Sequence, residues 1–222
     1  MNTFLGANDD PRGALEIFSR YGYSRDSVFI HLDAALNGGW WYDSPDTPKF
    51  KIHEDFDSIS VSGHKWFGGI VCGLYFVTKF RAAPAGTQEI AYVKLVDRMI
   101  SGSRNGSAAV IWQGRMHQFD WKHELERCIQ NAKFLEKTLT DNDIRCLRNF
   151  LFVVFPKPTA ELALKYQLMV VGGNAQVICM PHITEKDIGS FLSDYFVEVD
   201  CEITPKSTSL LDKAFFNNIA NN

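Results

Sequence analysis

Two residues that can do chemistry, Asp33 and Lys65, each follow a stretch with the character of a β-strand. Val28–Leu32 is a mainly apolar stretch that runs directly into the carboxylate, and Ser58–Ser62 comes shortly before the lysine. A lysine amine forms an imine with an aldehyde, and a carboxylate keeps a pyridine ring protonated. Together the two residues therefore provide what an enzyme needs to hold pyridoxal 5′-phosphate (PLP).

Each of the two residues also has a simpler interpretation. A lysine is most often a solvated surface charge, and an aspartate at a strand end often caps a helix or joins a structural ion pair. Lys65 is set apart because it lies between His64 and Trp66 and is followed by a Gly-Gly turn. Partial desolvation there would make its amine a better nucleophile. For Asp33, a buried carboxylate needs a partner, and the pyridinium N–H would supply one.

Neighbouring small and polar residues extend this interpretation. Ala35 is small enough for a flat ring to lie close to the backbone. Ser62 and His64 flank a glycine and, with Ser60, could donate hydrogen bonds to a phosphate. His31 either packs near the ring or is an ordinary core histidine, and the sequence leaves both alternatives open.

The elements around these residues predict an α/β fold. Asp10 and Pro11 are a favourable N-cap and first position for a helix that ends at Gly22. The lack of polar alternation in Val28–Leu32 predicts a strand buried on both faces of a parallel sheet. Residues 37–56 read as a loop, and loops of that length in compact domains are usually functional. The further expected strands are Ser58–Ser62 and Val71–Thr78.

A small α+β domain is predicted to follow, so that the chain divides into residues 1–106, 107–196 and a tail of 197–222. Residues 120–139 carry a 3.6-residue apolar stripe typical of an amphipathic helix, whereas residues 81–100 show only a weak pattern. The expected elements of this domain are helices over 108–118, 120–139, 159–169 and 185–195, and strands over 151–155 and 175–180.

Composition excludes several classes of function. The 222 residues are 45% hydrophobic and 22% charged, with a net charge of −3, which is typical of a globular protein. Mild acidity gives no electrostatic case for nucleic acid, and no apolar run is long enough to span a membrane. The five cysteines lack the spacing of a metal site or a disulfide framework. We therefore expect reduced thiols, no bound metal and a cytoplasmic location.

These residues carry a family resemblance. His31-Leu-Asp-Ala-Ala35 and Ser62-Gly-His-Lys-Trp66 resemble the group II PLP-dependent amino-acid decarboxylases, within the branch of the histidine and serine decarboxylases. Gly102-Ser-Arg-Asn-Gly106 supports the branch, and the resemblance runs from residue 3 to about residue 196. It implies the fold-type I PLP-dependent transferase fold, with a partial large domain followed by the small α+β domain.

The resemblance assigns roles by position. Lys65 resembles the lysine that forms the Schiff base, and Asp33 the carboxylate on the pyridine nitrogen. Ala35 resembles the small residue packed on the ring, while Ser62 and His64 match positions that contact or flank the phosphate. The implied reaction is decarboxylation of a histidine-like or serine-like L-amino acid to the amine and CO2. A homodimer is implied for the full-length family member.

The chain also departs from the family, because the long segment that opens the family fold is missing. That segment supplies the main phosphate loop, the side chain stacked on the ring and much of the substrate pocket. We therefore expect these 222 residues to have little activity alone. Two alternatives stay open: another fold-type I lyase, such as an aldolase-like carbon–carbon lyase, or a non-catalytic remnant that pairs with another chain.

Overall fold

The computed structural model describes residues 3–41, 43–44, 47, 49–52, 54–69, 73–77, 88–90, 95–97 and 105–202. They form two compact units, which we call the first unit (residues 8–125) and the second unit (residues 3–7 and 126–202). The units divide at residues 125 and 126, and the chain's first described residues belong to the second unit. The predicted domain boundary at residues 106 and 107 stays a prediction, since a compact unit need not coincide with a domain.

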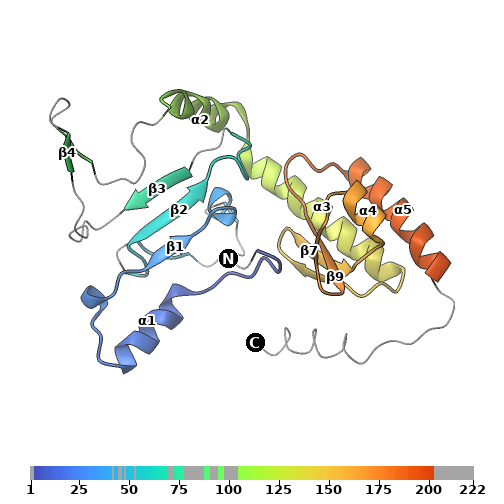
Figure 1. Cartoon of the computed structure of the whole chain (residues 1–222), viewed down its shortest axis with the longest axis horizontal. Coiled ribbons are helices and arrows are strands. Elements are labelled where there is room, and N and C mark those ends of the chain that lie inside the picture. Colours follow the sequence, from blue (N-terminus) through green and yellow to red (C-terminus); the bar gives the residue numbers. More distant parts are fainter. Residues whose placement is uncertain are drawn as a thin grey trace. The chain divides into compact units, whose positions relative to one another are not determined.

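A three-stranded mixed sheet organises the first unit (Figure 1). Its order is β1 (His31–Asp33), β2 (Ser58–Ser62) and β3 (Gly73–Val77), with β1 and β2 parallel and β2 and β3 antiparallel. The expectation of a parallel sheet is thus correct only for the first pair. The link from β2 to β3 is too short for the crossover that a parallel pair needs, so the chain doubles back.

The prediction that Val28–Leu32 is buried on both faces is wrong. The strand itself is only His31–Asp33, and both of its end residues are exposed while Leu32 is half-buried. Phe29, just before it, is 45% exposed. The physical reason is that β1 lies at the edge of the described sheet and turns its two polar side chains away from the core.

The helices of the first unit follow the predictions closely. α1 spans Pro11–Arg20, and Asp10 is its N-cap: the Asp10 side chain accepts a hydrogen bond from the Arg12 amide at 2.9 Å. α2 is Ser107–Gln118. In the predicted loop 37–56, the residues that the structure describes form a short 3-10 turn, Asn37–Gly39, and one isolated bridge. Two elements were not predicted: the 3-10 turn Arg25–Ser27 and the antiparallel hairpin of β4 (Gln88–Ile90) and β5 (Leu95–Asp97).

The predicted apolar stripe of the long helix is confirmed. α3 spans Trp121–Asp141 and crosses from the first unit into the second. No stripe residue is more than 8% exposed: Trp121, Leu125, Cys128, Ala132, Leu135 and Leu139. Their burial follows from the 3.6-residue repeat, which keeps them on one face of the helix.

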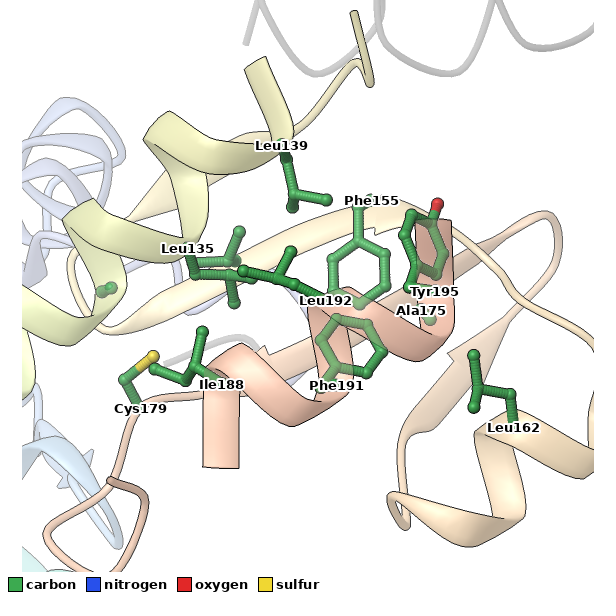
Figure 2. Close-up of a cluster of buried hydrophobic side chains, with 12 residues drawn as sticks. Leu135, Leu139, Phe155, Leu162, Ala175, Cys179, Ile188, Phe191, Leu192 and Tyr195 are labelled. Atoms are coloured by element: carbon green, nitrogen blue, oxygen red, sulfur yellow. The ribbon is translucent and has the colours of Figure 1, made fainter. Parts of the chain in front are cut away.

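The second unit is a four-stranded antiparallel sheet with helices on one face. The strand order is β6 (Leu147–Asn149), β7 (Phe152–Pro156), β9 (Asn174–Ile178) and β8 (Met169–Val171). Figure 2 shows side chains from α3 and α5 meeting over β7. Val153 and Phe155 face this core. On β9, the side-chain amide of Gln176 donates to the backbone carbonyl of Thr3 at 3.2 Å. This bond attaches residues 3–7 to the sheet of the second unit.

Two helix boundaries in the second unit differ from the predictions. The helix expected over 159–169 is only α4 (Ala160–Lys165), because Gln167 adopts φ 51° and β8 begins two residues later. α5 runs Glu185–Glu202, well beyond the expected end at residue 195. Residues 197–202 are therefore helical, and residues 203–222 lie outside the described residues.

Side-chain bonds tie α4 to α5. The Asp194 carboxylate accepts from the Lys165 ammonium at 2.7 Å and from the Tyr166 hydroxyl at 2.5 Å. These bonds hold the pKa of Asp194 below its usual range, the lysine contributing most. At the other end of α4, the Thr159 amide donates to the Glu198 carboxylate at 3.1 Å. The two helices are thereby fixed to each other at both ends of α4.

Three of the five cysteines have side chains that the structure describes. Cys128, Cys146 and Cys179 form no disulfide among the described residues, and Cys128 and Cys179 are fully buried. Burial raises the pKa of Cys179 to about 12. Of the remaining two, Cys72 lies outside the described residues and Cys201 lies in the last turn of α5, where side chains are not described.

Candidate functional site

The parallel pairing of β1 and β2 brings the two predicted reactive segments to one edge of the sheet. Asp33 lies opposite Ser60 in the register. The pairing continues past the strands, because the Ala34 amide donates to the Ser60 carbonyl at 3.0 Å and the Ser62 amide donates to the Ala35 carbonyl at 2.9 Å. Parallel strands end at the same edge, so the residues after β1 and after β2 emerge together.

A buried ion pair fixes the opposite ends of the same two strands. The Asp57 carboxylate is fully buried, accepts from the Ile30 amide at 2.8 Å and lies 3.1 Å from the Arg25 guanidinium. Arg25 also donates to the backbone carbonyls of Val28 and Glu54, at 2.9 and 2.8 Å. The start of β1 is thereby bonded to the residue just before β2, which sets the register that Asp33 and Lys65 depend on.

Lys65 lies in a tight turn that backbone bonds close. The Gly68 amide donates to the Lys65 carbonyl at 3.1 Å, and the Gly69 amide donates to the Gly63 carbonyl at 3.0 Å. Gly68 has φ +57°, which glycine adopts without the strain a side chain would bring. His64 and Lys65 are both exposed on this turn, whereas the flanking Gly63 is buried. The turn therefore presents the lysine outward from a fixed backbone.

Aromatic side chains anchor the turn immediately after the lysine. Trp66 is 2% exposed and packs edge-on against Trp40, with ring centroids 4.9 Å apart. Phe67 is 7% exposed and packs on Trp112 and Trp121 at 4.8 and 4.9 Å. Each such ring pair adds about 0.5–1.5 kcal/mol beyond area burial. From the sequence, Trp66 was noted only as a neighbour of Lys65. The aromatic cluster was not predicted, because it joins residues far apart in the chain.

We expect Gly63→Ala to displace the lysine turn. A Cβ at this position would lie 2.3 Å from the Trp112 ring, which is closer than real contacts allow. Either the indole or the turn must shift, at a cost of about 1–3 kcal/mol. Urea unfolding followed by tryptophan fluorescence measures the loss. Gly114→Ala is the control, because a Cβ there meets nothing within 4 Å; equal stability of the two variants would contradict the expectation.

A cavity of about 270 Å³ opens beside Asp33. His31 lies in its wall, with Nδ1 2.7 Å from the Ser58 hydroxyl and Nε2 3.2 Å from the Ser60 hydroxyl. The two serines thus hold the imidazole on the same face of the sheet as Asp33, two residues along. The residues that line the cavity are Asn8, Asp9, His31, Leu32, Asp33, Ala34, Asn37, Trp41, Thr47 and Phe50.

The structure brings some of the predicted site residues together and leaves others outside this cavity. Asp33 lines the cavity, as does His31, which had been left between two roles. Ala35, Ser62, His64 and Lys65 do not line it, although they share the sheet edge with Asp33. Of the Gly102–Gly106 motif, residues 102–104 lie outside the described residues. Contacts of Ser62 and His64 with a phosphate stay predictions.

Sequence reasoning missed most of the cavity wall. Four lining residues, Asn37, Trp41, Thr47 and Phe50, come from the loop 37–56, whose length alone indicated a function. Asn37 reaches back to the Asn8 side-chain oxygen at 2.6 Å. No signal in the local sequence could have paired two asparagines that lie 29 residues apart.

One Asp33 carboxylate oxygen and the Lys65 amine are accessible for contact with PLP. Asp33 Oδ1 accepts from the Ala35 amide at 3.1 Å, and its Oδ2 has no hydrogen-bond partner among the described residues. Within the same part of the chain, Lys65 Nζ makes no ion pair or hydrogen bond, and its side chain is exposed. One free carboxylate oxygen and one free amine on neighbouring strand ends fit a cofactor that carries a pyridine N–H and an aldehyde.

No family model matches the chain, but a comparison with known proteins identifies relatives. It is 32% identical over 191 residues to a histidine decarboxylase of Vibrio anguillarum, covering 83% of this chain and 49% of that protein. It is 31% identical over 199 residues to serine decarboxylase 2 of Oryza sativa subsp. japonica, covering 86% of this chain and 42% of that protein. The chain is a homologue of these amino-acid decarboxylases. The resemblance drawn from the Asp33 and Lys65 motifs is thereby confirmed.

A solved structure supports the fold of this decarboxylase homologue. An L-methionine decarboxylase from Streptomyces sp. 590 superposes with a TM-score of 0.68 at 24% identity, covering 87% of this chain and 51% of that one. The predicted α/β, fold-type I architecture is confirmed for the part that the chain covers. The homologue spans about half the length of the relatives it matches. None of its described helices combines the length and hydropathy that crossing a bilayer requires.

Proposed function

We propose that this homologue contributes the lysine and carboxylate half of a PLP-dependent site that decarboxylates an L-amino acid. The observation that supports it most directly is that Asp33, at the end of β1, and Lys65, shortly after the paired strand β2, keep Oδ2 and Nζ without a hydrogen bond or ion pair among the described residues. The comparisons support the same reaction class through relatives named histidine and serine decarboxylase.

Different residues of this chain would hold different parts of the cofactor. Lys65 would attach PLP through its amine, and Asp33 would accept a hydrogen bond from the pyridine N–H and keep that nitrogen positively charged. Ala35 would lie against the ring, and Ser62 and His64 would donate to the phosphate. When bound, PLP supplies an electron sink for the pair of electrons released as the Cα–carboxylate bond breaks.

The surroundings of Asp33 determine how well it performs this role. The Ala35 amide occupies Oδ1 and fixes the carboxylate orientation, leaving Oδ2 for the ring nitrogen. His31, held through the Ser58 and Ser60 hydroxyls, borders the same cavity and adds a polar wall. A carboxylate oriented in this way loses little conformational freedom when the ring arrives, which favours binding.

A histidine-like or serine-like substrate is the narrower form of this proposal, drawn from the relatives' names. We extend the proposal to a homodimer, which the family resemblance implies, and to a cytoplasmic location, which the wide and irregular spacing of the cysteines in the sequence favours. Decarboxylation of L-histidine or L-serine is measured as CO2 release by the full chain with PLP present.

The direct test is covalent capture of PLP. The folded chain is mixed with PLP, examined for a visible absorption band that free PLP lacks, reduced with borohydride and digested for mass spectrometry. We expect one dominant pyridoxyl label, on Lys65. A folded sample that carries no label at Lys65, or the same label density at every exposed lysine, overturns the proposal for this chain.

A further inference from the structure

The imidazole of His31 joins the two strands that lead to the candidate site. Its Nδ1 lies 2.7 Å from the Ser58 hydroxyl, and its Nε2 lies 3.2 Å from the Ser60 hydroxyl. A hydroxyl can donate or accept a hydrogen bond, so both bonds form with either tautomer of the neutral ring. One side chain of β1 is thereby bonded to two side chains of β2.

These two bonds brace the register of the parallel pair. His31 lies directly opposite Ser58, whereas Ser60 is two residues further along β2 and lies opposite Asp33. The ring therefore makes one direct and one diagonal contact across the strands, and sliding β1 along β2 would break at least one of them. A slip of one residue would also turn the Asp33 side chain to the other face of the sheet.

Strand β1 depends on such a brace because it is short and lies at an edge. It has three residues, and its only sheet partner among the described residues is β2. The ion pair of Arg25 and Asp57 acts before the strand begins, through the bond that Asp57 accepts from the Ile30 amide. Strand ends fray more easily than their centres, and Asp33 is the last residue of β1.

The brace faces the space where a pyridine ring would lie. His31 and Asp33 are two residues apart on one strand, so their side chains point to the same face of the sheet. Both line the cavity of about 270 Å³. The ring N–H would bond to Asp33 Oδ2, which makes no hydrogen bond or ion pair among the described residues. The aim of this oxygen therefore depends on how firmly β1 is held.

We propose that His31 is a positioning residue for the Asp33 carboxylate. By bonding Ser58 and Ser60, it holds β1 in the register that aims Oδ2 at the pyridine N–H of PLP. This role rests on the proposed function, because His31 acts on the cofactor only through Asp33. A carboxylate that is held in place before the ring arrives binds it more tightly than one that must be ordered during binding.

Two ligands that cannot form an imine test this role. Pyridoxine 5′-phosphate carries the pyridine nitrogen, its 1-deaza analogue carries a C–H in that place, and neither has the aldehyde with which Lys65 would react. Isothermal titration calorimetry gives both dissociation constants for the full chain. We expect the unchanged chain to prefer the ligand with the nitrogen. We expect His31→Phe to reduce this preference about fivefold, which corresponds to the net contribution of about one hydrogen bond.

Two further variants separate positioning from a general loss of structure. The amide of His31→Gln can also donate and accept, so this variant should keep most of the preference. Ser60→Ala removes only the diagonal bond and should reduce the preference about twofold. Urea unfolding followed by tryptophan fluorescence shows that each variant is folded.

The outcomes distinguish this role from the proposed function. An undiminished preference in His31→Phe, or an equal loss of affinity for both ligands, overturns the positioning role and leaves the role of Asp33 intact. An unchanged chain that shows no preference for the ring nitrogen overturns the role of Asp33 in the proposed function, and the role of His31 with it.

Discussion

Replacing Lys65 by alanine is expected to remove the dominant borohydride-fixed label from the chain. The turn presents this amine outward, and its Nζ has no partner among the described residues. Its removal costs little folding energy, since exposed side chains away from special contacts contribute within about 0.5 kcal/mol. The variant therefore separates attachment of the cofactor from stability of the fold. The measurement is label occupancy by mass spectrometry after PLP and borohydride treatment.

Lys51→Ala is the matched control for that experiment. Lys51 is also an exposed lysine of the first unit, but it pairs with Glu54 at 2.9 Å. We expect it to leave the label on Lys65 unchanged. A label that persists in the Lys65 variant, at another lysine and with similar occupancy, would mean that PLP reacts with surface amines without selection.

The position of Asp33 and Lys65 at neighbouring strand ends could be predicted, because each position depends on a short local stretch of sequence. Asp33 ends its strand and Lys65 follows its own closely, and the apolar character of Val28–Leu32 predicted a parallel partner for the first of these strands. The same reasoning was too coarse for burial. Val28–Leu32 reads as a buried strand from composition, yet Phe29 and His31 are exposed, because composition does not reveal which strand lies at an edge.

The elements that hold the site in place could not be predicted, because they join residues far apart in the chain. Trp112 and Trp121 pack on Phe67 from across more than 40 positions, and nothing near Phe67 indicates them. The same holds for the bond between Asn8 and Asn37 in the cavity wall. A periodic helix such as α3 is the opposite case, because the apolar pattern that marks its buried face lies within one continuous segment.

Asp57→Asn is expected to destabilise the first unit by about 3 kcal/mol. The carboxylate is fully buried, and it lies 3.1 Å from the Arg25 guanidinium while accepting the Ile30 amide. Removing one partner of a buried ion pair leaves an uncompensated charge, which costs about 3–5 kcal/mol. Arg25 keeps a quarter of its side chain exposed, so water offsets part of that cost and the lower figure applies.

The measurement isolates the first unit, because all five tryptophans lie within residues 40–121 and urea unfolding by tryptophan fluorescence reports on that unit. Asp43→Asn, at an exposed carboxylate, should change the free energy of unfolding by less than about 0.5 kcal/mol. If the ion pair carries the effect, Asp57→Asn combined with Arg25→Gln must cost less than the two single variants added together. Strict additivity would mean that Asp57 stabilises the unit through its hydrogen bond from the Ile30 amide and not through Arg25. That bond alone would then set the register of β1 and β2, on which the positions of Asp33 and the lysine turn depend.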